Sequence, residues 1–298
     1  KFMIRIPKGT FLVEGIGAVL FAFQFVPEFG FIKGAWYGIF HSISAFCNAG
    51  IDILGSTSFM QYVTSPLVSF TTMFLIVTAG LGFPVWHDNA VNVKKCGEKR
   101  KRPLKWLFTR LQLQSKVVLT MTAGLILIGT LGFFLIEYHN PETMGALGLP
   151  QKLMASMFQS VTTRTAGFAS VPQGGLEESS KLLGCILMFI GGSPAGTAGG
   201  IKTTTAAMLL LTVIGVLRNR RDTECFDRKI DNGIVKSGVT IALITFIFLF
   251  CGIAALTLFE PEADFLNLMY EANSAMGTVG LSADLTPQLG RGSHVVLM

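Results

Sequence analysis

The sequence predicts an all-α polytopic membrane protein in which units of membrane helix, re-entrant pore loop and membrane helix are repeated. Of its 298 residues 50% are hydrophobic and only 14% are charged, against about 25% charged residues in soluble domains. Four uncharged runs are long enough for a membrane span, which needs about 20 apolar residues; they are Val63–Trp86, Val117–Ile136, Leu182–Ile201 and Gly238–Phe259. One polar pattern also occurs three times along the chain. The low charge and high hydrophobicity exclude a disordered chain.

Basic residues mark the predicted cytoplasmic side. Most of them lie in three segments, which are the N-terminal stub with Lys1, Arg5 and Lys8, Lys94–Arg110, and Arg218–Lys236. Because cytoplasmic loops of membrane proteins are enriched in Lys and Arg, we place all three segments in the cytoplasm. The connections on the opposite side carry acidic residues, namely Glu28, Glu137, Glu142, Glu260, Glu262 and Asp264. Nucleic-acid binding is a weaker interpretation, because the basic segments hold few aromatic residues and adjoin membrane spans.

The region between the two basic loops reveals the repeating unit. Two cytoplasmic loops must be separated by an even number of membrane crossings. The spans that begin at Val117 and Leu182 supply two, and Leu153–Gly167 lies between them. That segment is too short and too polar to cross, so it must enter the membrane and return on the same side. The unit is therefore span, re-entrant loop, span.

The same pattern appears in three places. Phe40–Gly50 reads FHSISAFCNAG, Phe158–Gly167 reads FQSVTTRTAG, and Tyr270–Gly280 reads YEANSAMGTVG. Each copy has an aromatic residue, then polar and small residues, then a glycine, and the middle copy is one residue shorter. Each copy follows a basic segment, so the three units run in the same direction. Parallel repeats imply an axis along the membrane normal.

The last three residues of each copy, which we name the tips, are candidate cation ligands. A short helix that ends at each tip leaves carbonyl oxygens unsatisfied at its partially negative end. Rings of such carbonyls replace hydration water in potassium filters, and glycine permits the backbone to approach the ion. The predicted filter residues are Asn48, Ala49, Gly50, Thr165, Ala166, Gly167, Thr278, Val279 and Gly280. The alternative, a set of close helix contacts at small residues, leaves the neighbouring polar residues unexplained.

The glycine-rich run in the third predicted span cannot form a regular helix, because each Gly costs about 1 kcal/mol and Pro about 3 kcal/mol there. The run consists of Gly191, Gly192, Ser193, Pro194, Ala195, Gly196, Thr197, Ala198, Gly199 and Gly200. It is not a Walker A loop, because Ile201 separates Gly200 from Lys202. A passive kink for packing is one alternative. Lys202 either projects toward the pore as a cation barrier or extends to the membrane interface.

These motifs resemble the Ktr/Trk/HKT superfamily of potassium transporters, in particular the bacterial TrkH/KtrB-type membrane subunit. The matching segments are Phe40–Ile51, Phe158–Phe168, Tyr270–Leu281 and Gly191–Thr205. The resemblance implies four membrane-pore-membrane repeats around a pseudo-four-fold pore axis, and a gating loop beneath the filter at Gly191–Gly200. It also implies that this chain lacks the first repeat and the end of the last helix. The second repeat then covers 1–93, a cytoplasmic loop 94–112, the third repeat 113–218, another loop 219–236, and the truncated fourth repeat 237–298.

Several other residues near the tips have expected roles. We expect Arg164 to point away from the ion path and to donate hydrogen bonds to backbone carbonyls behind the filter. Glu271, on the third pore helix, is expected to accept structural hydrogen bonds. His41 and Asn48 are expected to form hydrogen bonds within the protein rather than to bind a metal. Asp52 and Asp284 follow two tip glycines and are expected at the outer mouth, where they either attract cations or are simply solvated.

The resemblance implies potassium uptake across the bacterial cytoplasmic membrane, with K⁺ as the transported ion and no cofactor bound by this chain. It further implies a homodimer that docks on a cytosolic nucleotide-binding regulatory subunit of the RCK/KTN type, with the basic loops as candidate docking surfaces. The alternative is a cation-coupled secondary transporter that binds its substrate at the broken helix Gly191–Gly200. An enzyme is not expected, because the sequence shows no paired acid and base, nucleophile elbow or zinc-ligand spacing.

Overall fold

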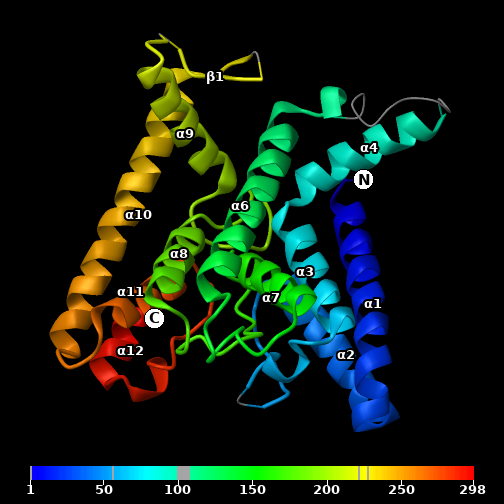
Figure 1. Ribbon diagram of the computed structural model, residues 1–298. Helices are drawn as coiled ribbons and strands as arrows, with labels where there is room; N and C mark the ends of the chain where they lie inside the picture. Colours follow the sequence, from blue (N-terminus) through cyan, green and yellow to red (C-terminus); the bar gives the residue numbers. More distant parts are fainter. Residues whose placement is uncertain (1, 56, 99–107, 221, 227) are drawn as a thin grey trace.

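The computed structural model describes residues 2–55, 57–98, 108–220, 222–226 and 228–298. The described chain is largely helical, with one short two-stranded hairpin at the end that carries α4 (Figure 1). Its helices are α1 (Phe2–Phe29), α2 (Phe31–Phe46), η1 (Met60–Tyr62), α3 (Pro66–Gly80), α4 (Phe83–Glu98), α6 (Leu113–Glu137), α7 (Leu149–Thr162), α8 (Glu178–Phe189), α9 (Thr203–Leu217), α10 (Asn232–Phe259), α11 (Phe265–Met276), η2 (Thr286–Gln288) and α12 (Arg291–Leu297). The strands are β1 (Glu224–Cys225) and β2 (Arg228–Lys229), paired antiparallel.

Three helices of the described chain are long and apolar enough to cross a membrane. They contain Ile6–Phe29, Leu113–Glu137 and Asn232–Phe259, and the bent pair α3 and α4 makes a fourth if it is counted as one span. The prediction of a polytopic helical membrane protein is confirmed. Two of the four predicted runs correspond to α6 and α10. The span in α1 does not appear among the uncharged runs, because Lys8, Glu14 and Glu28 lie within it.

The other two predicted runs are interrupted, and each interruption has a physical cause. The run Leu182–Ile201 is wrong as a continuous span: α8 ends at Phe189, and the chain becomes helical again only at Thr203. This confirms the helix break expected from the glycine-rich run. The run Val63–Trp86 bends by 97° between α3 and α4. Gly82 adopts a φ of +83° at the bend, a left-handed conformation that glycine adopts without steric cost.

Each unit consists of a long helix, a short pore helix and a following helix. These are α1, α2 and α3 in the first unit, α6, α7 and α8 in the second, and α10, α11 and α12 in the third. In two units a glycine of the long helix packs at the same junction, so that an added Cβ would overlap a pore-helix serine and a leucine of the following helix. The sets are Gly17 with Ser42 and Leu75, and Gly129 with Ser160 and Leu187. Such close approach at small residues is typical of helix packing in membranes.

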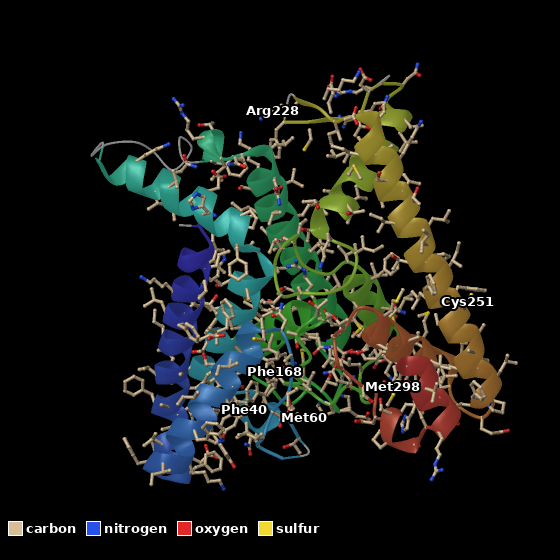
Figure 2. The ribbon with its side chains drawn as sticks, turned by 180° about the vertical axis from the view of Figure 1, so that it is seen from behind. Phe40, Met60, Phe168, Arg228, Cys251 and Met298 are labelled. Atoms are coloured by element: carbon tan, nitrogen blue, oxygen red, sulfur yellow. The ribbon has the colours of Figure 1, made fainter. Side chains whose placement is uncertain are left out.

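The basic segments lie together at one end of the molecule. Figure 1 shows the β1–β2 hairpin, α4 and the N-terminus at that end, with α2, α7 and α11 in the opposite half. Figure 2 shows Arg228 of the hairpin far from Phe40 of α2. This arrangement agrees with a shared cytoplasmic side. The predicted basic residues at 99–107 and Arg221 lie outside the described residues.

Candidate ion-binding site

The three tips have the same backbone conformation. Their first residues have positive φ, at 52° for Asn48, 78° for Thr165 and 53° for Thr278. Their glycines do too, at 65° for Gly50, 89° for Gly167 and 87° for Gly280, whereas the residue between them does not. A left-handed residue other than glycine is uncommon and costs conformational energy, and such residues cluster at functional sites. The left-handed conformation of a residue other than glycine occurs at the first position of all three tips, so the fold specifies it.

The end of each pore helix explains why the middle copy is shorter. Ala49 N donates to Ser44 O at 2.9 Å and Val279 N donates to Ser274 O at 2.8 Å, each five residues back. Ala166 N instead donates to Thr162 O, four residues back, at 2.9 Å. The middle helix therefore closes with one residue fewer while its tip keeps the same conformation.

A pore-helix hydroxyl fixes the chain that leaves the tip in two units. Ser44 Oγ donates to Ile51 O at 2.6 Å, and Thr162 Oγ1 donates to Phe168 O at 2.6 Å. In both cases the accepting carbonyl belongs to the residue after the tip glycine. Ser274 has the matching position in the third unit, but its Oγ is buried and has no hydrogen-bond partner in the described part of the chain.

The tips pack against one another in sequence order. A Cβ on Gly50 would overlap the Ala166 carbonyl oxygen, and a Cβ on Gly167 would overlap the Val279 carbonyl oxygen. A Cβ on Gly280 would have no described atom within 4 Å. The middle tip is buried throughout, whereas Thr278 and Gly280 of the third tip are exposed. The tips thus form an arc whose middle member is enclosed and which is open beside Gly280.

The arc collects the negative ends of three helices. The pore helices α2, α7 and α11 all end at a tip, where their last carbonyl groups lack intrahelical partners. Each helix end carries roughly half an elementary negative charge. Three such ends in contact attract a cation and disfavour an anion.

Contacts outside the tips hold neighbouring units together. Phe59 stacks on Phe168 with ring centroids 4.7 Å apart, and Phe59 N donates to Ala169 O at 3.0 Å. On the other side of the middle unit, Tyr270 Oη donates to Gln173 Oε1 at 2.8 Å, and Gln159 Nε2 donates to the same oxygen at 2.6 Å. These contacts limit movement of the tips relative to one another.

Glu271 and His41 occupy matching positions and make matching contacts. Glu271 is 4% exposed and accepts hydrogen bonds from Ser282 Oγ at 2.6 Å, Ala283 N at 3.0 Å and Thr286 Oγ1 at 2.7 Å. His41 Nε2 accepts from Ile53 N at 3.4 Å, and its Nδ1 lies 2.7 Å from Tyr37 O. Ala283 and Ile53 both lie three residues after a tip glycine. The sequence predicted hydrogen bonds for each residue but not that they bind the same part of the unit.

Two expected hydrogen-bond roles are wrong. Asn48 is 7% exposed, but neither its Nδ2 nor its Oδ1 has a partner among the described residues. Arg164 is also 7% exposed and its Nε has no partner there, so the expected hydrogen bonds from this side chain to carbonyls behind the filter are not found among the described residues.

The segment between α8 and α9, which we name the intramembrane loop, leaves the helical path and returns to it. Ile190 and Ile201 form a parallel bridge, with Ile201 N donating to Phe189 O at 3.1 Å. Thr203 N donates to Gly192 O at 2.9 Å, which closes the base of the loop. The positive φ of Ala195 (58°) within the loop is one reason that a helix cannot continue there.

The intramembrane loop contacts the ends of α2 and α3 and the third tip. Ser193 N donates to Gly80 O at 2.9 Å, and Thr197 Oγ1 donates to Phe46 O at 3.1 Å. A Cβ on Gly199 would overlap Thr278 Oγ1. The loop is therefore packed directly against the ends of the pore helices.

Lys202 and the two aspartates complete the set of predicted residues. Lys202 Nζ donates to Ala198 O at 2.7 Å, so the side chain binds a carbonyl group of its own loop. The two arrangements expected for it, toward the pore or toward the membrane interface, stay predictions. Asp52 Oδ1 accepts from Leu54 N at 3.3 Å. Asp284 is exposed and has a φ of 62°. An outer-mouth role for the two aspartates stays a prediction.

The fold and the tips define a helical membrane protein with repeated re-entrant pore loops. A family model described as "TrkH: Cation transport protein" matches residues 9–298, and the chain belongs to this family. The family is one of transport proteins, which agrees with the expectation that the chain is not an enzyme.

Individual relatives support this assignment. The Ktr system potassium uptake protein B of Bacillus subtilis is 38% identical over 286 residues, which are 96% of this chain and 61% of that protein. The potassium/sodium uptake protein NtpJ of Enterococcus hirae is 37% identical over 97% of this chain and 61% of its own length. The crystal structure of the potassium transporter TrkH from Vibrio parahaemolyticus matches with a TM-score of 0.68 at 17% identity, covering 96% of this chain and 57% of that one. This chain spans about three fifths of the length of these relatives.

Proposed function

We propose that the full-length protein takes up potassium ions across the bacterial cytoplasmic membrane through a filter of backbone carbonyls. The observation that carries this proposal is the left-handed conformation shared by the three tips, together with their packing in one arc. The names of the relatives from Bacillus subtilis and Enterococcus hirae, a potassium and a potassium/sodium uptake protein, favour K⁺ as the transported ion.

The carbonyl ligands come from Asn48, Ala49, Gly50, Thr165, Ala166, Gly167, Thr278, Val279 and Gly280. Carbonyl rings conduct when they replace the hydration shell of an ion without holding it too tightly. A fourth re-entrant unit beside Gly280, outside this chain, closes the arc around a pseudo-four-fold axis. The open space next to Gly280 supports this placement.

The intramembrane loop at Gly191–Gly200, with Lys202 at its end, restricts the ion path beneath the filter. Its hydrogen bonds to Gly80 and Phe46 and its contact with Thr278 support this role. Irregular backbone at membrane depth persists only when protein buries it or water solvates it, and a loop that lies against the tips can line the ion path.

The protein acts as a homodimer that docks on a cytosolic nucleotide-binding regulatory subunit of the RCK/KTN type. The relative from Bacillus subtilis is described as part of a "Ktr system", which supports a multi-subunit assembly. The basic segments around α4 and the β1–β2 hairpin lie at one end of the molecule and are the proposed docking surface (Figure 1).

The experiment that tests this function is cation flux into liposomes that contain the full-length protein. K⁺, Rb⁺ and Na⁺ are compared under the same gradient for the wild type and Gly280→Ser. We expect K⁺ and Rb⁺ to pass, Na⁺ to pass poorly, and the substitution to lower the preference for K⁺, because serine is strained at a φ of 87°. Flux that requires a second solute, or an unchanged ion preference in the variant, would contradict the proposal and favour a coupled transporter with its site at the broken helix.

A further inference from the structure

A small cavity lies between the middle tip and the base of the intramembrane loop. Its volume is about 10 Å³, and it is lined by Ile76, Val77, Gly80, Thr122, Val161, Arg164 and Gly192. These residues come from α3, α6, α7, the residues after α7, and the loop. The cavity is as large as one water-sized probe, and a cavity of about 10–15 Å³ by this measure holds a single water molecule.

Two residues that line this cavity each carry a buried polar atom without a protein partner. Arg164 Nε and Thr122 Oγ1 both lack a hydrogen bond within the described part of the chain. The two residues are 7% and 5% exposed. An unpaired buried polar group costs about 1–3 kcal/mol, and more when it is charged. Buried water normally resolves this cost where several unsatisfied groups face one small space.

We propose that one water molecule occupies this cavity and bridges Arg164 Nε and Thr122 Oγ1. The arginine N–H donates to the water, and the threonine hydroxyl either donates or accepts. No carboxylate lines the cavity, so the positive charge of Arg164 makes a bound cation unfavourable. The volume is also too small for a larger ligand.

The bridge makes Arg164 a positioning residue for ion selection, an inference that rests on the proposed function. Arg164 directly precedes Thr165, the first residue of the middle tip. Gly192 lines the same cavity, and its neighbour Ser193 donates its N–H to Gly80 O. The water therefore joins the middle tip to α6, next to the base of the intramembrane loop.

Only the middle unit has a charged residue directly before its tip. In the other two units, the residue before the tip is Cys47 or Gly277, neither of which carries a charge. A cation at the end of α7 interacts favourably with the negative end of that helix. The side chain is thus held at the one tip that is enclosed on both sides.

The test uses Thr122→Val in the full-length protein, because valine has the shape of threonine without its hydroxyl group. The control is Thr130→Val on the same helix. Thr130 Oγ1 is also buried and without a partner among described residues, but Thr130 does not line the cavity. The ratio of K⁺ flux to Na⁺ flux into liposomes is measured for both variants. This ratio does not depend on how much protein folds.

We expect T122V to lower the K⁺ to Na⁺ flux ratio about fivefold, which is the change that the loss of one hydrogen bond typically causes. T130V is expected to leave the ratio unchanged. R164K keeps the charge and removes Nε, so T122V and R164K together are expected to have no more effect than either alone. A wild-type ratio in T122V, or additive effects in the double variant, would overturn the bridge. If R164K does not fold, the comparison of T122V with T130V alone decides whether the water bridge exists. If the wild type itself shows no selective flux, the proposed function is overturned. If the wild type is selective but T122V keeps the wild-type ratio, only the water bridge is overturned.

Discussion

Replacing Glu271 with alanine tests whether this carboxylate fixes the chain after the third tip. The substitution removes the acceptor of hydrogen bonds from Ser282 Oγ, Ala283 N and Thr286 Oγ1, which are 2.6, 3.0 and 2.7 Å long. Hydrogen bonds to a charged group contribute roughly 1.5–3 kcal/mol each and are not additive. Because Ala283 N is also left buried without an acceptor, which costs about 1–3 kcal/mol, we expect a total loss of about 3–5 kcal/mol.

The assay combines thermal unfolding in detergent with the K⁺ to Na⁺ flux ratio in liposomes. In a chain of similar size, each kcal/mol of lost stability lowers Tm by roughly 2–4 °C. The expected loss therefore lowers Tm by about 6 °C or more. Glu271→Gln keeps one acceptor oxygen, so its effect should be less than half as large. The control is Glu262→Gln, in the exposed connection before α11. If Glu271→Ala matches this control in both Tm and flux ratio, the reasoning is refuted.

Three further predictions follow from individual contacts. Gly50→Ala should impair folding and selectivity more than Gly30→Ala, because both glycines have positive φ but only the Cβ at position 50 overlaps a neighbouring tip; folded yield and flux ratio rank the two. Thr197→Val removes the hydrogen bond from the intramembrane loop to Phe46 O and should raise K⁺ flux by about twofold to fivefold; unchanged flux would contradict a gating role. Hydrogen bonds from Ser293 and Gly290 lower the pKa of the Glu260 carboxyl. The stabilisation is therefore present above the ordinary carboxyl pKa and is lost as pH falls through the lowered value, so hydrogen-exchange protection of α12 should decrease on acidification in the wild type but not in Glu260→Gln.

The tips and the helix break were predictable because local chemistry dominates there. A glycine after polar and small residues, repeated three times, indicates a repeated backbone turn whatever surrounds it. Five glycines and a proline within ten residues exclude a regular helix in the same way. The span in α1 was not predicted from uncharged runs, because Lys8, Glu14 and Glu28 divide it into uncharged stretches shorter than a membrane span.

The contacts of individual side chains were less predictable, because they depend on residues far apart in the sequence. The hydrogen bonds expected for the Asn48 and Arg164 side chains are not found among the described residues, although both residues are buried. Lys202 bonds to a carbonyl four residues earlier only because the intramembrane loop turns back on itself. The spacing of residues along the chain contains no information about which carbonyl groups remain accessible after such a turn.

The sequence by itself determined the membrane class, the three re-entrant units, their common direction and the interrupted helix. Each of these depends on hydrophobicity, charge or backbone preference over a short segment. Only the tertiary structure decided that the tips lie in one arc, that Glu271 and His41 hold matching segments, and that Arg164 and Thr122 meet at one small cavity. These features arise where separate helices approach closely enough to exclude most water, so that a polar group must find its partner in another part of the chain.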